Sequence, residues 1–231
     1  MNIDLNSDLG EGCGADAEMM TRVTSANISC GFHAGDASTA RTGLRLAKHH
    51  GVQVGAHPGY ADREHFGRRE MDLGEDGVFE LCIYQISALA GLAKAVGIPI
   101  HYLKPHGALY NQACRDDVAA RGIVAAAEFL QLPVMALPDS RLDALCRGRV
   151  GFIREGFADR RYQDDGRLMP RDRPDAFIKD VNEAVMQADR LVRERGIASL
   201  CVHGDNPQAL EFVRSLREAF ARQGINVRAF A

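Results

Sequence analysis

The sequence predicts a parallel α/β protein closed into a (β/α) barrel. Short apolar runs that have the character of strands alternate with amphipathic helical patterns along the whole chain, as in proteins built from repeated βα units. Seven such units, followed by a short run at 225–230, are too many for a small open sheet. Most of the strands also end in a cluster of Gly, His, Asp, Lys or Glu. Because the ends of parallel strands meet on one face, this placement predicts an enzyme.

Length and composition indicate one domain. The 231 residues, 46% hydrophobic and 26% charged, are enough to bury a full core, and we expect a single catalytic domain over 1–231. Basic and acidic residues, 28 and 31 in number, are interspersed and give a net charge of −3, which argues against a nucleic-acid partner. There is no signal-peptide pattern and no apolar run near the roughly 20 residues of a membrane span, so we expect a cytoplasmic protein without membrane contact.

The six cysteines are scattered, and none forms a C-x-x-C pair. A chain of this size does not need disulfides to be stable, so we expect free thiols. Three of them lie within apolar segments and are expected in the core: Cys30, Cys82 and Cys201.

Each predicted strand is a short run rich in aliphatic residues and bounded by turn formers. In chain order the runs are Ile3–Asp8, Ala26–Cys30, Val52–Ala56, Pro99–Lys104, Pro133–Leu137, Val150–Glu155 and Ser199–His203.

The last two helices have the clearest patterns. Over 175–196, apolar residues recur at spacings of three and four, with Asp175 as a possible N-cap and Gly196 as the stop. The pattern repeats after Pro207, which suits a first helical turn. Earlier in the chain, Asp36 is expected to cap a helix that begins near Ala37, and His49-His50 to lie at the C-terminal end of that helix.

The two-residue period of the strands predicts a polar barrel interior. Asp4, Asn6 and Asp8 share one face of the first strand, opposite the apolar Ile3 and Leu5. The same alternation groups Gln53 with His57, Tyr102 with Lys104 and His106, and His203 with Asp205. Barrel interiors are usually filled by branched apolar residues, so this much polarity favours a substrate pocket over simple packing.

Four histidines lie at strand ends: His33, His57, His106 and His203. One histidine in such a place is often structural, but four that converge favour a functional role. Among the acids, Asp8, Glu11 and Asp205 can act as general bases, metal ligands or caps, and Asp8 and Asp205 are the ones we favour for chemistry.

Lys104 is a strand-end lysine in an arginine-rich chain, and such a group can stabilise a phosphate or a developing oxyanion. Arg160 follows the strand that carries Glu155, where its guanidinium can hold a carboxylate or phosphate, although a solvated charged loop explains much of 155–173 equally well. Neither a P-loop nor a G-x-G-x-x-G fingerprint is present, so nucleotide binding is not predicted from motifs.

A metal site is an alternative. Asp8, His33 and His57 together offer imidazole and carboxylate ligands suited to Zn²⁺ and leave a position for water. No helical H-x-x-x-H spacing supports this triad.

Taken together, the clusters resemble the LamB/YcsF family. The matching stretches run from end to end of the chain: 4–14, 27–36, 54–71, 103–111, 154–173 and 201–205. The resemblance implies an irregular seven-stranded (β/α) barrel of the glycoside hydrolase/deacetylase type. It also implies ATP-dependent hydrolysis of 5-oxo-L-proline to L-glutamate, with Mg²⁺ as counter-ion of ATP and two partner subunits, B and C. We expect these partners to dock at the strand-exit rim of the barrel, where the loops 60–72 and 159–174 are long enough to reach them.

With this reaction in view, each candidate residue has an expected role. We expect catalysis from Asp8, Glu11, His57, Lys104, His106 and Asp205, and substrate binding from His33, Arg68, Glu155, Arg160 and His203, with no metal ligand assigned. Two rival functions remain open at this point: a metal-dependent deacetylase or amidohydrolase, and a non-catalytic scaffold for the partner subunits.

Overall fold

The computed structural model describes residues 1–203 and 208–230. Its strands are β1 (Asn2–Leu9), β2 (Ser25–Ser29), β3 (Gln53–His57), β4 (Tyr102–Leu103), β5 (Val134–Ala136), β6 (Phe152–Phe157), β7 (Ser199–Cys201) and β8 (Asn226–Val227). Its helices are α1 (Asp16–Met20), α2 (Ala37–His50), the short 3-10 helix η1 (Arg63–His65), α3 (Gly74–Val96), α4 (Gly107–Ala113), α5 (Asp117–Leu130), α6 (Arg141–Cys146), α7 (Val181–Arg195) and α8 (Ala209–Arg222).

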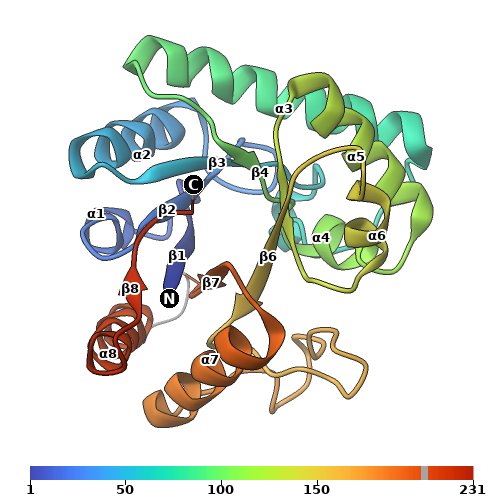
Figure 1. The fold of residues 1–231 in the computed structure, drawn as a ribbon. Coiled ribbons are helices and arrows are strands. Elements are labelled where there is room, and N and C mark those ends of the chain that lie inside the picture. The colour runs from blue at the N-terminus through green and yellow to red at the C-terminus, as the bar shows by residue number, and fades with distance from the viewer. Residues whose placement is uncertain (204–207, 231) are drawn as a thin grey trace.

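Seven parallel strands close into a barrel. Hydrogen-bonded neighbours follow the order β2-β3-β4-β5-β6-β7-β1, and a further pairing of β1 with β2 joins the two ends. β8 adds to the start of β1, where Ile3 lies opposite Val227. Figure 1 shows the longer helices around the outside of the strands. The predicted barrel is confirmed, and it is irregular because β4 pairs with β5 only through Leu103 and Val134.

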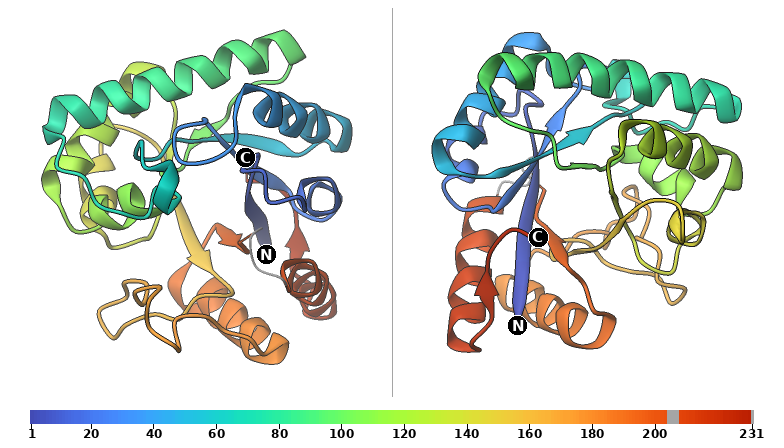
Figure 2. Two further views of the ribbon diagram at one scale, coloured as in Figure 1. Left: turned by 180° about the vertical axis from the view of Figure 1, so that it is seen from behind. Right: turned by 45° about the horizontal axis from the view of Figure 1, so that its top comes forward.

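The predicted strands are all present, but β4 is shorter than the run from Pro99 to Lys104. The predicted helix from Asp175 starts later than expected, because Asp180 is the N-cap of α7 and its side chain accepts from the backbone of Glu183. The residues before Asp180 instead run back beside the segment that follows β6. There the backbone N–H of Arg161 donates to the Ala176 carbonyl at 3.0 Å. Figure 2 shows this long excursion between β6 and α7.

Three helix ends agree with the sequence. The Asp36 side chain accepts from the backbone of Ser38 and Thr39, which makes it the N-cap of α2. His50 is the last residue of α2 before Gly51, and Gly196 ends α7, both glycines with the positive φ of a helix C-terminus.

The long helix α3 departs from a prediction. An 18-residue window of α3 has a mean hydropathy of 1.3, enough in length and composition for a membrane span, although core helices of soluble proteins pass the same test. The expectation that no apolar run reaches this length is therefore wrong. The charged residues of α3 lie near its two ends, which leaves 81–93 uncharged. Its buried side chains recur with helical spacing: Val78, Cys82, Ile86, Leu89 and Ala93.

None of the six cysteines, all of which lie in the described residues, forms a disulfide. Cys82 and Cys201 are buried as predicted, whereas Cys30 is partly exposed at the end of β2.

A glycine in β3 makes room for an aromatic ring inside the barrel. A Cβ atom at Gly55 would lie 2.2 Å from the Tyr102 ring, so the ring can occupy this space only because residue 55 has no side chain. The Tyr102 hydroxyl donates to Asn27 Oδ1 at 2.6 Å, and Asn27 Nδ2 donates to Asp8 Oδ1 at 2.8 Å. Phe230 packs against Tyr102 with 5.2 Å between ring centroids.

Asp4 ties three segments together inside the barrel. Its Oδ1 accepts from Thr24 Oγ1 at 2.6 Å and Ser25 Oγ at 2.7 Å, and its Oδ2 accepts from Ser199 Oγ. Burial raises the pKa of Asp4 to about 6, although the three hydroxyl donors oppose the shift. The side chain therefore holds its proton to a higher pH in the folded protein than in the unfolded chain.

This raised pKa predicts a pH-dependent stability. As pH rises from about 4 to about 6, the unfolded chain loses the Asp4 proton first, so this group lowers the free energy of unfolding by about 3 kcal/mol and the loss is complete above about 6. Asp4→Asn removes this contribution. The free energy of unfolding, measured in urea, should fall by about 3 kcal/mol less between pH 4 and pH 7 in Asp4→Asn than in the unaltered protein. Asp189→Asn on α7 serves as the matched control, and equal pH profiles for all three proteins would contradict the assignment.

Candidate active site

The ammonium of Lys104 lies at the centre of the polar interior. Its Nζ atom is 2.7 Å from Glu155 Oε1, 2.9 Å from Asp8 Oδ1 and 3.2 Å from Asn6 Oδ1. The side chain is only 2% exposed, and Cys201 Sγ lies 3.3 Å from the same nitrogen. β1, β6 and β7 thus each present a partner to a lysine that follows β4.

These contacts fix the charge of the group. Burial by itself lowers the pKa of Lys104, but the carboxylates of Asp8 and Glu155 outweigh it and hold the pKa well above its usual value. Burial likewise favours the neutral form of Asp8, yet opposing interactions, among them the Lys104 ammonium 2.9 Å away, hold the pKa of Asp8 well below its usual range. Lys104 is therefore a permanent cation and Asp8 a permanent anion, which suits Lys104 for charge stabilisation and not for proton abstraction.

Next to this ion cluster, four side chains meet at the ends of β1, β2, β3 and β4. His57 Nε2 and His106 Nδ1 are 3.0 Å apart, and Glu11 Oε1 is 3.4 Å from His106 Nδ1 and 3.9 Å from His57 Nε2. His33 Nε2 reaches the same Glu11 oxygen at 3.1 Å. His57 Nε2 is also 3.4 Å from Asp8 Oδ2, so the two clusters are continuous.

Close approach of the backbone allows this packing. The rings of His33 and His106 are stacked with centroids 3.8 Å apart. Gly67 lies over them with a φ of 65°, and a Cβ atom there would be 2.6 Å from His33 Cβ and 3.0 Å from His106 Cδ2. Position 67 therefore requires glycine both for its conformation and for space.

A buried aspartate orients His203 on the opposite side of the barrel. His203 Nδ1 is 3.0 Å from Asp159 Oδ1, and the His203 backbone N–H donates to Asp159 Oδ2 at 3.2 Å. Burial raises the pKa of Asp159, but the facing His203 lowers it more, so the carboxylate stays ionised. A carboxylate can only accept, so Nδ1 carries the proton and the other ring nitrogen, Nε2, is left as a base.

A small crevice connects these groups to a larger cavity. The crevice has a volume of about 30 Å³, room for one or two waters, and is lined by Asp8, His57, Lys104, His106, Phe157 and His203 together with neighbouring loop residues. The adjoining cavity has a volume of about 380 Å³. Its wall shares Gly107, Asn111, Arg160, Leu168 and Arg171 with the crevice.

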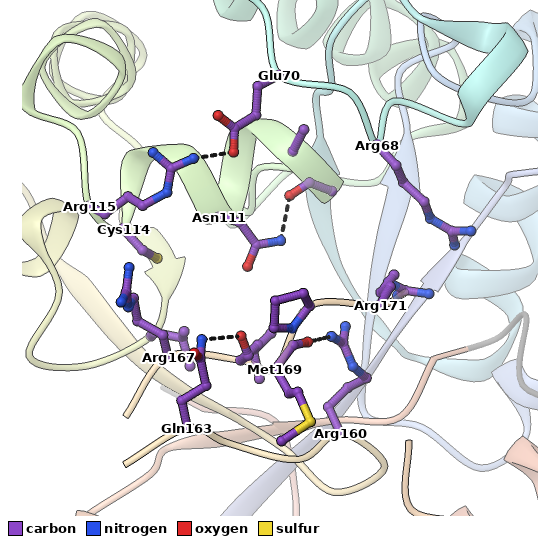
Figure 3. Close-up of a pocket in the computed structure, with 15 residues that line it drawn as sticks. Arg68, Glu70, Asn111, Cys114, Arg115, Arg160, Gln163, Arg167, Met169 and Arg171 are labelled. Carbon is purple, nitrogen blue, oxygen red and sulfur yellow. Dashed lines mark hydrogen bonds and ion pairs between the residues drawn. The ribbon is translucent and has the colours of Figure 1, made fainter. Parts of the chain in front are cut away.

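The larger cavity is rich in arginine. Figure 3 shows Arg68, Arg160 and Arg171 along one side of it, while Arg115 pairs with Glu70 on another. Arg160 is buried, and its guanidinium donates to the Met169 carbonyl and lies 4.9 Å from the Phe177 ring. Burial, with Arg171 nearby, lowers the pKa of Arg160 to about 10. The three cations side by side form a surface suited to an anion.

Among the residues that the structure describes, two groups of side chains have the composition of metal sites: Glu11 with His33, His57 and His106, and Asp8 with Cys201 and His203. In the second group the Lys104 ammonium contacts both Asp8 and Cys201, and burial holds the pKa of the Cys201 thiol well above its usual value. A cation beside Lys104 would be repelled, so the second group does not suit a metal. The predicted triad of Asp8, His33 and His57 is also rearranged, because His33 bonds Glu11.

The structure brings most of the predicted site residues together. Around the crevice and the histidine cluster lie Asp8, Glu11, His33, His57, Lys104, His106 and His203, and Arg68 and Arg160 line the cavity. Glu155 is fully buried and bonded to Lys104 and Tyr110, so the structure places it behind Lys104 and away from a substrate. Asp205 lies outside the described residues.

Several contributors were not predicted. Asp159 comes two residues after β6 and one before Arg160, and its place at a strand end was the available signal. Tyr110 donates to Glu155 Oε2 at 2.8 Å, and Cys201, expected as an ordinary core residue, contacts Lys104. Neither pairing has a signal in the spacing of the sequence.

Comparison with known proteins gives consistent results. The model of the LamB/YcsF family matches residues 3–231. Proteins from two strains of Thermus thermophilus, each named as the A subunit of 5-oxoprolinase, are both 43% identical to this chain over the full length of the chains compared.

Solved structures agree on the fold. The crystal structure of a lactam utilization protein from Thermus thermophilus superposes with a TM-score of 0.91, at 42% identity and over all of both chains. The catalytic domain of a peptidoglycan N-acetylglucosamine deacetylase from Eubacterium rectale gives a TM-score of 0.53 at 8% identity, covering 99% of this chain and 88% of that one. The second likeness concerns the fold alone and confirms the deacetylase type of barrel.

The Asp159 contact predicts the tautomer of His203. In the unaltered protein, two-dimensional ¹⁵N NMR of the imidazoles should show a protonated Nδ1 at His203. In Asp159→Asn the amide can donate to Nδ1 instead, and the proton should move to Nε2. Asp189→Asn should leave the His203 signals unchanged. An Nε2-protonated ring in the unaltered protein would refute the arrangement.

Proposed function

Since the chain belongs to the LamB/YcsF family, we propose that it is the A subunit of an ATP-dependent 5-oxoprolinase, which hydrolyses 5-oxo-L-proline to L-glutamate. Two relatives named as the A subunit of 5-oxoprolinase support this substrate, as does the solved lactam utilization protein. All three are similar over the whole chain. The observation that carries the proposal is the fixed Lys104 cation beside an oriented His203, in a crevice open to an arginine-rich cavity.

The chemistry explains the need for ATP. A five-membered lactam is a poorly electrophilic amide, and transfer of the γ-phosphoryl group of ATP to its oxygen, with release of ADP, activates the ring carbon. Addition of water to that carbon gives a tetrahedral intermediate, and breaking of the ring C–N bond, with a proton delivered to nitrogen, gives γ-glutamyl phosphate. A second water then releases phosphate and L-glutamate.

The crevice supplies the groups for water attack. In the neutral imidazole of His203 the Asp159 contact places the proton on Nδ1, so Nε2 is the general base for the water, and Lys104 stabilises the charge that develops on oxygen. The crevice, at about 30 Å³, has room for one or two waters but is too small for the lactam. The substrate is therefore assigned to the adjoining cavity of about 380 Å³.

The same cavity suits the phosphoryl group. Arg68, Arg160 and Arg171 face it from two loops, and a planar guanidinium can hold two oxygens of a phosphate at once. These arginines can bind a phosphate without a glycine-rich loop. They therefore suit a lactam that has already been phosphorylated when it binds. We assign the binding of ATP and the phosphoryl transfer to the assembled complex with subunits B and C.

Replacing the ammonium by an uncharged side chain tests the role of Lys104. Lys104→Met should lower kcat/KM of the assembled enzyme by about 100-fold, equivalent to about 3 kcal/mol, because the developing charge loses its cation. Loss of the ammonium also leaves Asp8 and Glu155 buried without their cationic partner, which destabilises the fold.

Adding Glu155→Gln to Lys104→Met restores the charge balance, and the double variant should regain stability without activity. Lys48→Met, at an exposed lysine that donates to the Val96 carbonyl, is the matched control. A folded Lys104→Met enzyme with normal kcat/KM would remove Lys104 from the chemistry.

A second prediction concerns partners. The isolated chain should not release glutamate from 5-oxoproline, with or without ATP and Mg²⁺, and activity should appear when subunits B and C are added, with one ADP formed per glutamate. The two loops that carry Arg68 and Arg160 form the wall of the cavity, so a partner docked there can complete the site. ATP-independent turnover by the chain alone would contradict both the coupling and the need for partners.

A further inference from the structure

In the histidine cluster, two ring nitrogens and a carboxylate oxygen face one another at short distances. His57 Nδ1 is 2.8 Å from the carbonyl oxygen of Lys104, and His106 Nε2 is 2.8 Å from that of Phe66. A carbonyl oxygen only accepts, so these two nitrogens carry the ring protons. The remaining nitrogens, His57 Nε2 and His106 Nδ1, then present lone pairs to each other at 3.0 Å.

A carboxylate joins the same point. Glu11 Oε1, which only accepts when ionised, is 3.4 Å from His106 Nδ1 and 3.9 Å from His57 Nε2. Three electron-rich atoms that converge in a nearly closed site repel one another unless a cation lies among them.

The spacing is that of a coordination sphere. Ligand atoms about 2.1 Å from one ion lie about 3.0 Å apart at right angles and about 3.4 Å apart in a tetrahedron. Two of the three observed separations, 3.0 and 3.4 Å, have these values, and the third, 3.9 Å, needs a small side-chain movement. We propose that Glu11, His57 and His106 bind one divalent transition-metal ion of the zinc class.

The surroundings have the features of an outer coordination shell. Histidine ligands in proteins commonly donate their second N–H to a backbone carbonyl, as both His57 and His106 do. His33 cannot be a fourth in-plane ligand, because its ring is parallel to that of His106, with an interplanar angle of 2° and centroids 3.8 Å apart. Its Nε2 instead lies 3.1 Å from Glu11 Oε1, which makes His33 a positioning residue for the carboxylate.

Two imidazoles and a carboxylate are a ligand set preferred by zinc, manganese, iron, cobalt and nickel over magnesium or calcium. Three protein ligands also leave a position for water or a substrate oxygen, and the nearby Asp8 Oδ2, 3.4 Å from His57 Nε2, can accept a hydrogen bond from such a water. The site stands on this geometry alone and does not depend on the proposed lactam reaction.

Metal binding can be measured directly on the untagged full chain. Elemental analysis of the purified protein should find close to one transition-metal ion per chain. After chelation, titration with Zn²⁺ alone should show one saturable site that raises the thermal midpoint, and Co²⁺ should give visible absorption bands of a nitrogen and oxygen site. These measurements need neither substrate nor partner subunits, so their failure is distinguishable from failure of the proposed function.

Variants separate ligands from positioning residues. His106→Gln and Glu11→Gln should each weaken Zn²⁺ binding by more than about 100-fold, and His33→Gln by about 10-fold, the range for an outer-shell partner. His49→Gln, which removes an imidazole from the end of α2, should bind Zn²⁺ like the unaltered protein.

Three results would overturn the proposal. The first is an unaltered protein that binds neither Zn²⁺ nor Mn²⁺ at a saturable site. The second is binding that His49→Gln weakens as much as His106→Gln, which would indicate adventitious surface binding. The third is ¹⁵N NMR that shows a protonated imidazolium at His57 or His106 in the presence of Zn²⁺, because a proton would then occupy the place of the metal. Should His106→Gln fail to fold, Glu11→Gln and the Co²⁺ spectrum of the unaltered protein decide the question.

Discussion

The interior of this barrel depends on the buried ammonium of Lys104. A charge removed from water is tolerated only when opposite charges and hydrogen-bond acceptors surround it, and here they come from three other strands. Asp8 and Glu155 would themselves be unstable in an apolar interior without the lysine. Asp8 on the polar face of β1 and the buried carboxylate of Glu155 on β6 thus both depend on this one cation. They contact it only when the seven strands close into the barrel.

The site divides into two parts that share one histidine. Around Lys104 the protonation states are fixed, with a permanent cation and the ionised Asp8. Around Glu11, lone pairs converge in a way that favours a bound cation. His57 belongs to both parts, since its Nδ1 bonds the backbone of Lys104 and its Nε2 faces Asp8, Glu11 and His106. A change of charge in one part therefore alters the electrostatic environment of the other.

The loop between β6 and α7 adds a third part. Arg160 is held by backbone carbonyls of its own loop and by the Phe177 ring, so the positive wall of the cavity is built on an irregular segment with its own internal contacts. Such a wall can be positioned beside a rigid barrel end without a phosphate-binding loop. The long excursion replaces the regular helix start expected at Asp175, and it brings Arg171 to the cavity.

The sequence alone determined the repeated βα units, the closed parallel barrel and the inward face of the first, third, fourth and last predicted strands, because a two-residue period is a local property of the backbone. It also placed Asp8, His57, Lys104, His106 and His203 at one end of the barrel. Tertiary structure decided the pairings: His33 with Glu11, Asp159 with His203, and Glu155 behind Lys104. These pairs join residues 22 to 51 positions apart, where sequence spacing carries no information on contact, so only barrel closure and loop packing could select them.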